Sequence, residues 1–243
     1  MMTGDNSSVP RKINLFCFPF AGGSFYSYKE FEKYIPDYIN MIGIDLPGHG
    51  RRMGEPLLKD VHEMAEDIFY QIKGRLHEPY AIYGHSLGAI LSYLFAQKIV
   101  KENMPYPVLM FLSGRAAPPV CKEKYVHLLP KQEFIKKVNK YGGIPNEILQ
   151  EEELMDFMVP ILRADFEAAG TYKYEETVPL DIPMTVMTGL KDEEVEYKEA
   201  LKWQEVATEK ISVRQFPGGH FFIFEHPMEI VRILCQNLEK ALC

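Results

Sequence analysis

Short apolar runs alternate along this chain with longer stretches of helical periodicity, and this alternation most constrains its fold. Six runs are strand candidates, at Ile13–Phe18, Met41–Asp45, Tyr80–Tyr83, Val108–Leu112, Met184–Thr188 and Ile211–Phe216. Most are continuously apolar, as expected of strands that helices bury on both faces. The alternation therefore predicts an α/β fold with a mostly parallel central sheet flanked by helices. The last run alternates polar with apolar residues instead, which indicates an edge strand.

Two stretches between these runs and one after the last run predict helices that cover the sheet. The segment Ala89–Ala96 is apolar almost all round, which predicts a central, buried helix. Pro227 suits the first turn of a last helix. An amphipathic helix is predicted where apolar residues recur at helical spacing, namely at Val61, Met64, Ile68, Ile72 and Leu76.

One long segment, residues 115–179, interrupts the alternation because it contains no convincing strand. Helices are predicted within it at Pro130–Lys140 and Glu151–Tyr172, the second kinked by Pro160. We therefore predict a core formed by residues 1–114 and 180–243, with residues 115–179 as a helical lid insertion. An ordinary helical insertion packed on the sheet is the alternative.

Composition narrows the class of protein without indicating its chemistry. The formal net charge of −7 argues against nucleic acid as a partner. No run of about 18 apolar residues is present, so we expect no membrane span. Residues 1–12 are polar, which predicts a frayed tail without a secretory signal. The four cysteines form no CxxC pair, so we expect a cytoplasmic protein with reduced thiols, Cys17 being a buried hydrophobe.

A G-x-S-x-G motif at Gly84-His85-Ser86-Leu87-Gly88 carries the strongest chemical signal. The motif follows a strand candidate and precedes the buried helix, the setting of the nucleophile elbow in the α/β-hydrolase fold. In that setting the serine hydroxyl is exposed on a sharp turn. We therefore predict that Ser86 is a nucleophile, whereas a plain Gly-Ser turn is the alternative.

A serine nucleophile needs a base and an acid that orients the base, and in this fold they follow in the order acid, then histidine. Asp192 and His220 each come just after a strand candidate, at the sheet edge where such folds hold their sites. We predict a triad of Ser86, Asp192 and His220, although Asp192 beside two glutamates could also be a solvated loop acid.

An oxyanion hole requires two backbone N–H groups directed at the developing negative charge. We expect one from Leu87, which begins the helix after the nucleophile, and one from Ala21, in the loop after the first strand. A flexible Gly-Gly turn would explain that loop equally. His49, between two glycines, is interpreted as structural. No glycine cluster matches a phosphate-binding fingerprint and no cysteine or histidine spacing indicates a metal, so neither a cofactor nor a metal is expected.

Together these residues resemble the type II thioesterases, stand-alone editing enzymes of nonribosomal peptide and polyketide synthesis. The similarity runs nearly from end to end. The matching segments are Phe16-Cys17-Phe18-Pro19-Phe20-Ala21-Gly22-Gly23, Asp45-Leu46-Pro47-Gly48-His49-Gly50, Gly84-His85-Ser86-Leu87-Gly88, Ser113-Gly114-Arg115-Ala116-Ala117-Pro118-Pro119, Gly142-Gly143-Ile144-Pro145, Leu162-Arg163-Ala164-Asp165-Phe166, Gly189-Leu190-Lys191-Asp192 and Phe216-Pro217-Gly218-Gly219-His220-Phe221.

This resemblance implies hydrolysis of acyl thioesters on the phosphopantetheine arm of a peptidyl or acyl carrier protein, so that misprimed carriers are regenerated. A medium-chain thioesterase acting with a fatty acid synthase is the nearest alternative. A carboxylesterase or an acyltransferase would use the same triad, whereas a non-enzymatic module typically lacks one of its members. Nothing in the sequence requires more than a monomer.

The acidic charge of the chain conflicts mildly with a carrier partner, since carriers are usually acidic themselves. Arg51, Arg52 and Arg115 are interpreted as solvated surface charges, with local contacts to a carrier as the alternative.

Overall fold

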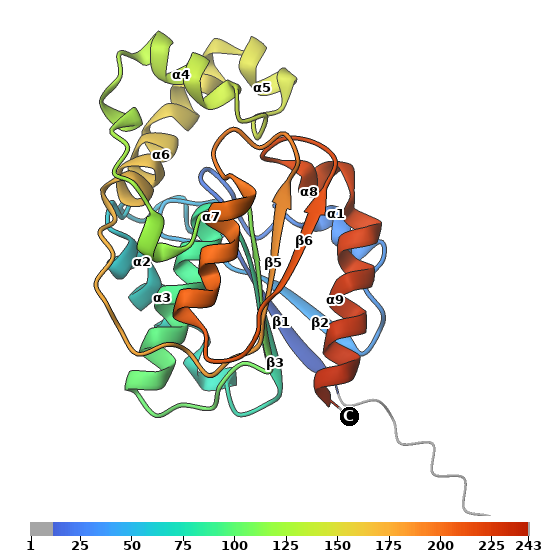
Figure 1. The fold of residues 1–243 in the computed structure, drawn as a ribbon. Coiled ribbons are helices and arrows are strands. Elements are labelled where there is room, and N and C mark those ends of the chain that lie inside the picture. The colour runs from blue at the N-terminus through green and yellow to red at the C-terminus, as the bar shows by residue number, and fades with distance from the viewer. Residues whose placement is uncertain (1–11, 243) are drawn as a thin grey trace, which may run out of the picture.

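A six-stranded, entirely parallel sheet forms the centre of the computed structural model, which describes residues 12–242 (Figure 1). The strand order is β2-β1-β3-β4-β5-β6, so the predicted parallel sheet and the edge position of the last strand are both confirmed. The strands are β1 (Ile13–Phe18), β2 (Ile39–Gly43), β3 (Tyr80–His85), β4 (Leu109–Ser113), β5 (Met184–Gly189) and β6 (Ser212–Phe216).

Helices cover both faces of the sheet and leave its carboxyl edge to the insertion. The α-helices are α1 (Lys29–Glu32), α2 (Val61–Ile72), α3 (Leu87–Lys101), α4 (Lys131–Asn139), α5 (Asn146–Gln150), α6 (Glu152–Thr171), α7 (Tyr197–Leu201), α8 (Phe222–Glu225) and α9 (Pro227–Leu242). Short 3₁₀ helices lie at Gly50–Arg52, Lys73–Arg75, Pro118–Val120, Val126–Leu128 and Lys202–Val206. The helices predicted from periodicity are present, whereas the short helices α1, α5, α7 and α8 were not predicted.

Successive residues of β1 show how the sheet is buried on both faces. Phe16 and Phe18 belong to one apolar core with α2 and α3, whereas Leu15 and Cys17 belong to a second core with α1 and α9. Because side chains alternate across a strand, a strand covered on both faces buries all of its side chains and is mostly apolar. This explains why β1, β3, β4 and β5 have every residue buried. Cys17 is buried and free, as expected.

Strand β2 begins and ends two residues before the predicted Met41–Asp45. It is an edge strand and is only partly buried, so hydrophobicity alone does not mark its limits. Its Asn40 instead donates a side-chain hydrogen bond to Asn14 of β1, at 2.8 Å. Asn40 therefore belongs to β2, although the apolar pattern placed it before the strand.

The insertion lies between β4 and β5 and holds α4, α5 and α6 above the carboxyl ends of β5 and β6 (Figure 1). It has a small apolar core of its own, centred on Phe134, Met155 and Leu162. Pro160 lies inside α6 without interrupting it. The polar tail predicted at the N-terminus falls almost wholly on residues 1–11, outside the described residues. No helix between residues 12 and 242 is long and apolar enough to cross a membrane.

Candidate active site

Ser86 occupies the sharp turn between β3 and α3, with φ 54° and ψ −112°. A positive φ is unusual for a residue with a side chain and marks strain of the kind found at nucleophile elbows. The turn is held because the Ser86 N–H donates to the Ser113 carbonyl at 2.8 Å. Close packing also requires a glycine at 88, since a Cβ there would lie 2.4 Å from the Phe18 carbonyl oxygen. The elbow predicted from the motif is therefore present.

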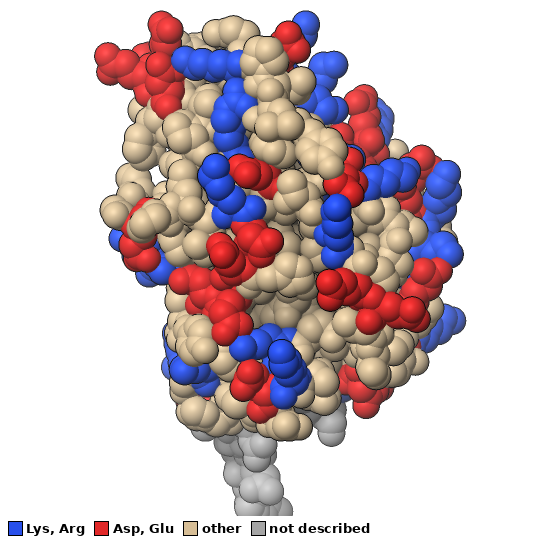
Figure 2. All heavy atoms as spheres, turned by 90° about the vertical axis from the view of Figure 1, so that its left-hand side faces the viewer, with Lys and Arg blue, Asp and Glu red and all other residues tan. Residues whose placement is uncertain are grey.

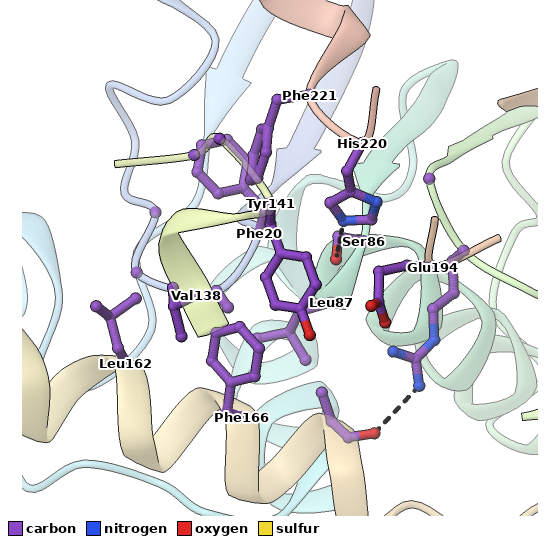
Figure 3. Close-up of a pocket in the computed structure, with 18 of the residues that line it drawn as sticks. Phe20, Ser86, Leu87, Val138, Tyr141, Leu162, Phe166, Glu194, His220 and Phe221 are labelled. Atoms are coloured by element: carbon purple, nitrogen blue, oxygen red, sulfur yellow. Dashed lines mark hydrogen bonds between the residues drawn. The ribbon is translucent and has the colours of Figure 1, made fainter. Parts of the chain in front are cut away.

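The structure brings together the three predicted triad residues. His220 lies 3.0 Å from Ser86 through Nε2 and Oγ (Figure 3). It lies 2.9 Å from Asp192 through Nδ1 and Oδ2. The Asp192 side chain is fully buried, and that of His220 is only 9% exposed. A buried carboxylate on Nδ1 fixes the imidazole so that Nε2 faces the hydroxyl, which is the arrangement required of a general base.

Two loops at the carboxyl edge of the sheet hold the acid and the base in register. Leu190 donates its N–H to Phe216 at 2.8 Å, and Lys191 donates to Gly218 at 2.9 Å, so the loops after β5 and β6 are bonded to each other. Asp192 also accepts a hydrogen bond from the Glu194 N–H at 2.9 Å through its other oxygen. Both carboxylate oxygens thus have a donor, as a buried charge requires.

The two predicted oxyanion-hole residues line the same pocket as Ser86. Among residues 12–242, neither the N–H of Ala21 nor that of Leu87 donates to a protein acceptor. For Leu87 this follows from its place as the first residue of α3, since the first N–H groups of a helix have no partner within it. Two unpaired donors beside a serine hydroxyl are the feature that an oxyanion hole needs.

A pocket of about 670 Å³ lies between Ser86 and the insertion. Figure 3 shows Val138, Leu162 and Phe166 across it from Ser86 and His220, whereas the ring of Tyr141 lies close to that of His220, at 5.9 Å between centroids. The insertion and the core therefore both line it. Its size lies within the range of roughly 300–1,000 Å³ typical of sites for small molecules.

His85 is fully buried directly beside the base, with its ring centroid 5.0 Å from that of His220. Its Nδ1 lies 2.9 Å from the Ser113 hydroxyl. Burial, and then the charge of His220, lower the pKa of His85 well below its ordinary value. A neutral His85 ring therefore packs beside His220 without competing with it for the proton of Ser86.

A second histidine–aspartate pair, which the sequence did not predict, joins the core to the insertion. His49 Nε2 lies 3.0 Å from Asp165 Oδ2, and both side chains are almost completely buried, at 3% and 0% exposure. The same Asp165 oxygen accepts the N–H of Gly22, at 2.6 Å. The structural role expected of His49 is thus supported by its buried contacts, and its partner lies 116 residues away on α6.

Of the three arginines interpreted as solvated surface charges, Arg51 agrees, with a side chain that is 64% exposed, whereas that of Arg52 is only 23% exposed. Both are also paired. Arg51 contacts Asp45 at 2.7 Å, and Arg52 contacts Asp67 at 2.6 Å. Arg115 lines the pocket and donates to the Ala169 carbonyl at 3.1 Å, so it is not a solvated surface charge. The prediction for Arg115 was wrong because the chain after β4 turns under the insertion. On the face seen in Figure 2, acidic and basic side chains are interspersed.

The acidic side chain beside the triad is also paired. Glu194 lines the pocket and contacts Lys124 and Lys137, both from the insertion. Burial opposes its ionisation, but Lys124 and Lys137 outweigh it and lower the pKa of Glu194 below its ordinary value. Among the described residues, no group of three or more histidine, cysteine or acidic side chains is placed to hold a metal ion.

Comparison with known proteins relates this geometry to a family. The gramicidin S biosynthesis protein GrsT of Aneurinibacillus migulanus is 34% identical over 238 residues, which cover 98% of this chain and 93% of GrsT. The type II thioesterase BorB from the borrelidin biosynthetic cluster matches in structure with a TM-score of 0.87 and 30% identity, covering 94% of each chain. ClbQ, from the colibactin NRPS/PKS pathway, matches with a TM-score of 0.89 and 29% identity, covering 95% of this chain and 98% of its own.

These neighbours confirm the α/β-hydrolase fold predicted from the elbow motif and the alternation of strand and helix segments. The family model described as the thioesterase domain matches residues 13–238, nearly the whole chain. The chain therefore belongs to the thioesterase domain family.

Proposed function

We propose that this protein is a serine thioesterase that removes acyl groups from the phosphopantetheine arm of carrier proteins, and so regenerates misprimed carriers in nonribosomal peptide or polyketide synthesis. One observation carries the chemistry: His220 lies within hydrogen-bond distance of both Ser86 and Asp192 on the wall of the pocket. The pathway rests on relatives such as BorB, which is named as a type II thioesterase.

In the first half of the reaction, His220 Nε2 takes the proton of Ser86 while Oγ attacks the thioester carbonyl. The N–H groups of Ala21 and Leu87 donate to the oxyanion that forms, and Asp192 stabilises the imidazolium. When the tetrahedral intermediate collapses, the C–S bond breaks. His220 then gives its proton to the departing pantetheine sulfur, leaving an acyl-Ser86 ester.

In the second half, His220 takes a proton from a water molecule, whose oxygen attacks the acyl-Ser86 carbonyl. The same two N–H groups hold the second oxyanion. Collapse breaks the bond to Oγ, and the proton on His220 returns to Ser86 as the carboxylic acid leaves. Losing one oxyanion donor typically costs about 2.7–4 kcal/mol of transition-state stabilisation.

In this proposal the insertion acts as a lid over the acyl chain. Met158, Leu162 and Phe166 of α6 present apolar surface to the pocket in which Ser86 lies. Apolar side chains there favour the hydrocarbon part of an acyl group over water. The carrier itself would remain outside and extend its arm to Ser86. The proposal includes the expected cytoplasmic location, a monomeric chain and no cofactor other than the carrier's own arm.

The size of the pocket supports a second candidate, a medium-chain fatty-acyl thioesterase that acts with a fatty acid synthase. A volume of about 670 Å³ exceeds what an acetyl group fills. The two candidates share every step at Ser86 and differ in the acyl length that is cleaved fastest.

The proposal is tested by comparing hydrolysis of acyl-phosphopantetheinyl carrier protein with that of the matching acyl-pantetheine and a p-nitrophenyl ester. Acyl groups from acetyl to medium chain form the series, and Ser86→Ala is the control. We expect fastest cleavage of the carrier-bound thioester and no turnover by Ser86→Ala. A preference for medium chains would favour the second candidate. Faster cleavage of the oxyester, with no gain from the carrier, would reduce the assignment to a general esterase.

A further inference from the structure

The loop after β1 is held from outside by a helix of the insertion. Gly22 lies in this loop, next to Ala21, and adopts a φ of +75° that favours glycine. Its N–H donates to Asp165 of α6 at 2.6 Å. A Cβ on Gly22 would lie 2.7 Å from the Leu162 side chain, so α6 packs directly on the loop. Leu162 and Asp165 are three residues apart and thus lie on one face of the helix.

The carboxylate that holds Gly22 is itself held by a histidine whose protonation is fixed by its partners. His49 Nδ1 lies 2.9 Å from the Pro47 carbonyl, which can only accept, so Nδ1 must carry a proton. Asp165 Oδ2 already accepts the Gly22 N–H, and His49 Nε2 lies 3.0 Å from the same oxygen. A carboxylate that accepts both bonds requires a proton on Nε2 as well. The arrangement suits an imidazolium that donates from one nitrogen to the Pro47 carbonyl and from the other to Asp165.

Two further charges bear on this pair. Burial disfavours the charged ring, but Asp165, the Pro47 carbonyl and Asp45 outweigh it and raise the pKa of His49 above its ordinary value. Asp45 also accepts the Phe25 N–H at 2.6 Å and contacts Arg51 at 2.7 Å. The loop that begins at Phe20 is thus anchored at Gly22 by Asp165 and at Phe25 by Asp45.

We propose that Asp165, held by His49, is a positioning residue for the oxyanion hole: it fixes the Gly22 peptide and thereby aims the neighbouring Ala21 N–H at the reacting carbonyl. This inference rests on the proposed function, because it assigns Ala21 to the oxyanion hole. An oxyanion donor is effective only within a few tenths of an ångström of its place, so a loop of glycines needs such an anchor.

The test replaces Asp165 by asparagine and measures transition-state stabilisation. Both bonds go to Oδ2 of Asp165. An asparagine with its oxygen in that place accepts them only as a neutral and weaker acceptor, and one with its NH₂ group there accepts neither. We expect kcat to fall about 10- to 100-fold with KM nearly unchanged, less than the roughly 10²–10³-fold typical of losing a donor outright. Affinity for an acyl trifluoromethyl ketone should fall by the same factor, because its adduct with Ser86 places an oxyanion in the hole.

The matched control is Asp156→Asn, which removes an exposed carboxylate from the same helix. We expect its kcat and inhibitor affinity to equal those of the wild type. If Asp165→Asn does not fold, His49→Gln carries the test, since it keeps an N–H for Asp165 but removes the charge; the same parallel losses are expected.

Unchanged kcat and inhibitor affinity in a folded variant would overturn the inference, as would a rise in KM alone. A lower melting temperature without those losses would mean that the pair is only structural. Failure of the proposed function would give a different result: the wild type would not cleave thioesters, or Ser86→Ala would still cleave them.

Discussion

Two buried histidine–aspartate pairs have the same composition and nearly the same separation, one beside the pocket and the other between the core and the insertion. His220 and Asp192 are 2.9 Å apart, and His49 and Asp165 are 3.0 Å apart. Both carboxylates are fully buried. The pairs differ at the second ring nitrogen, which faces the Ser86 hydroxyl in one and the Pro47 carbonyl in the other.

That difference decides what each pair can do. A hydroxyl can give up its proton, so the nitrogen of His220 that faces Ser86 can accept one. A carbonyl can only accept a hydrogen bond, so Nδ1 of His49 keeps its proton, while Nε2 faces Asp165. Neither nitrogen of His49 faces a group whose proton it could take for the reaction. The chemistry of a histidine–aspartate pair therefore follows from the group opposite the second nitrogen rather than from the pair itself.

The largest effect that separates the two pairs is expected from replacing each aspartate by asparagine. Asp192→Asn should lower kcat roughly 10⁴-fold, because the amide no longer selects the tautomer that leaves Nε2 free. Its loss should exceed that of Asp165→Asn by about 100-fold or more. Single-turnover acylation with an acyl-pantetheine measures both. Equal losses would contradict the distinction between a catalytic and a positioning pair.

A smaller effect concerns stability and its dependence on pH. His49→Gln should lower the free energy of unfolding by about 3 kcal/mol near pH 6, the lower end for buried pairs that lose one partner, since the amide still donates to Asp165. The folded-state pKa of His49 is raised, with Asp165 and Asp45 facing the ring. The charged ring therefore contributes fully below its unfolded pKa, and its contribution is lost as pH rises through the folded pKa.

Urea unfolding of both proteins across this range measures the effect. The difference between wild type and His49→Gln should shrink toward alkaline pH, whereas the stability of Asp156→Asn should follow the wild type throughout. A difference that is constant with pH would mean that the ring is neutral in the fold.

The contrast between the pairs also shows what a sequence can predict. Ser86, Asp192 and His220 each follow a strand, and the parallel sheet brings its carboxyl ends to one edge, so strand positions were enough to group them. Their geometry agrees with the predicted triad. Continuous apolar runs predicted the limits of β1, β4 and β5 to within one residue, because burial on both faces of a strand leaves such a run in the sequence.

The second pair had no comparable signal. Asp165 lies in the middle of a helix and His49 in a loop 116 residues earlier, so only the packing of the insertion on the core brings them together. The spacing places Asp165 on the apolar face of the helix, three residues after Leu162, but nothing in the sequence indicates which distant residue satisfies it there. The two-residue error at β2 has a related cause, since Asn40 is satisfied by a side chain of another strand.

The smallest predicted effect compares the buried attachment of the insertion with an exposed one. Lys124 of the insertion contacts Glu194 beside the triad, but the lysine side chain is 47% exposed. Lys124→Gln should lower the free energy of unfolding by only about 0–1 kcal/mol, since solvent screens the pair and Lys137 remains near Glu194. In about 1 M salt, where the Debye length is about 3 Å, this difference should vanish, whereas the cost of His49→Gln should persist. Urea unfolding at low and high salt measures both. A large cost for Lys124→Gln that resists salt would mean that the exposed contact, rather than the buried pair, holds the insertion on the core.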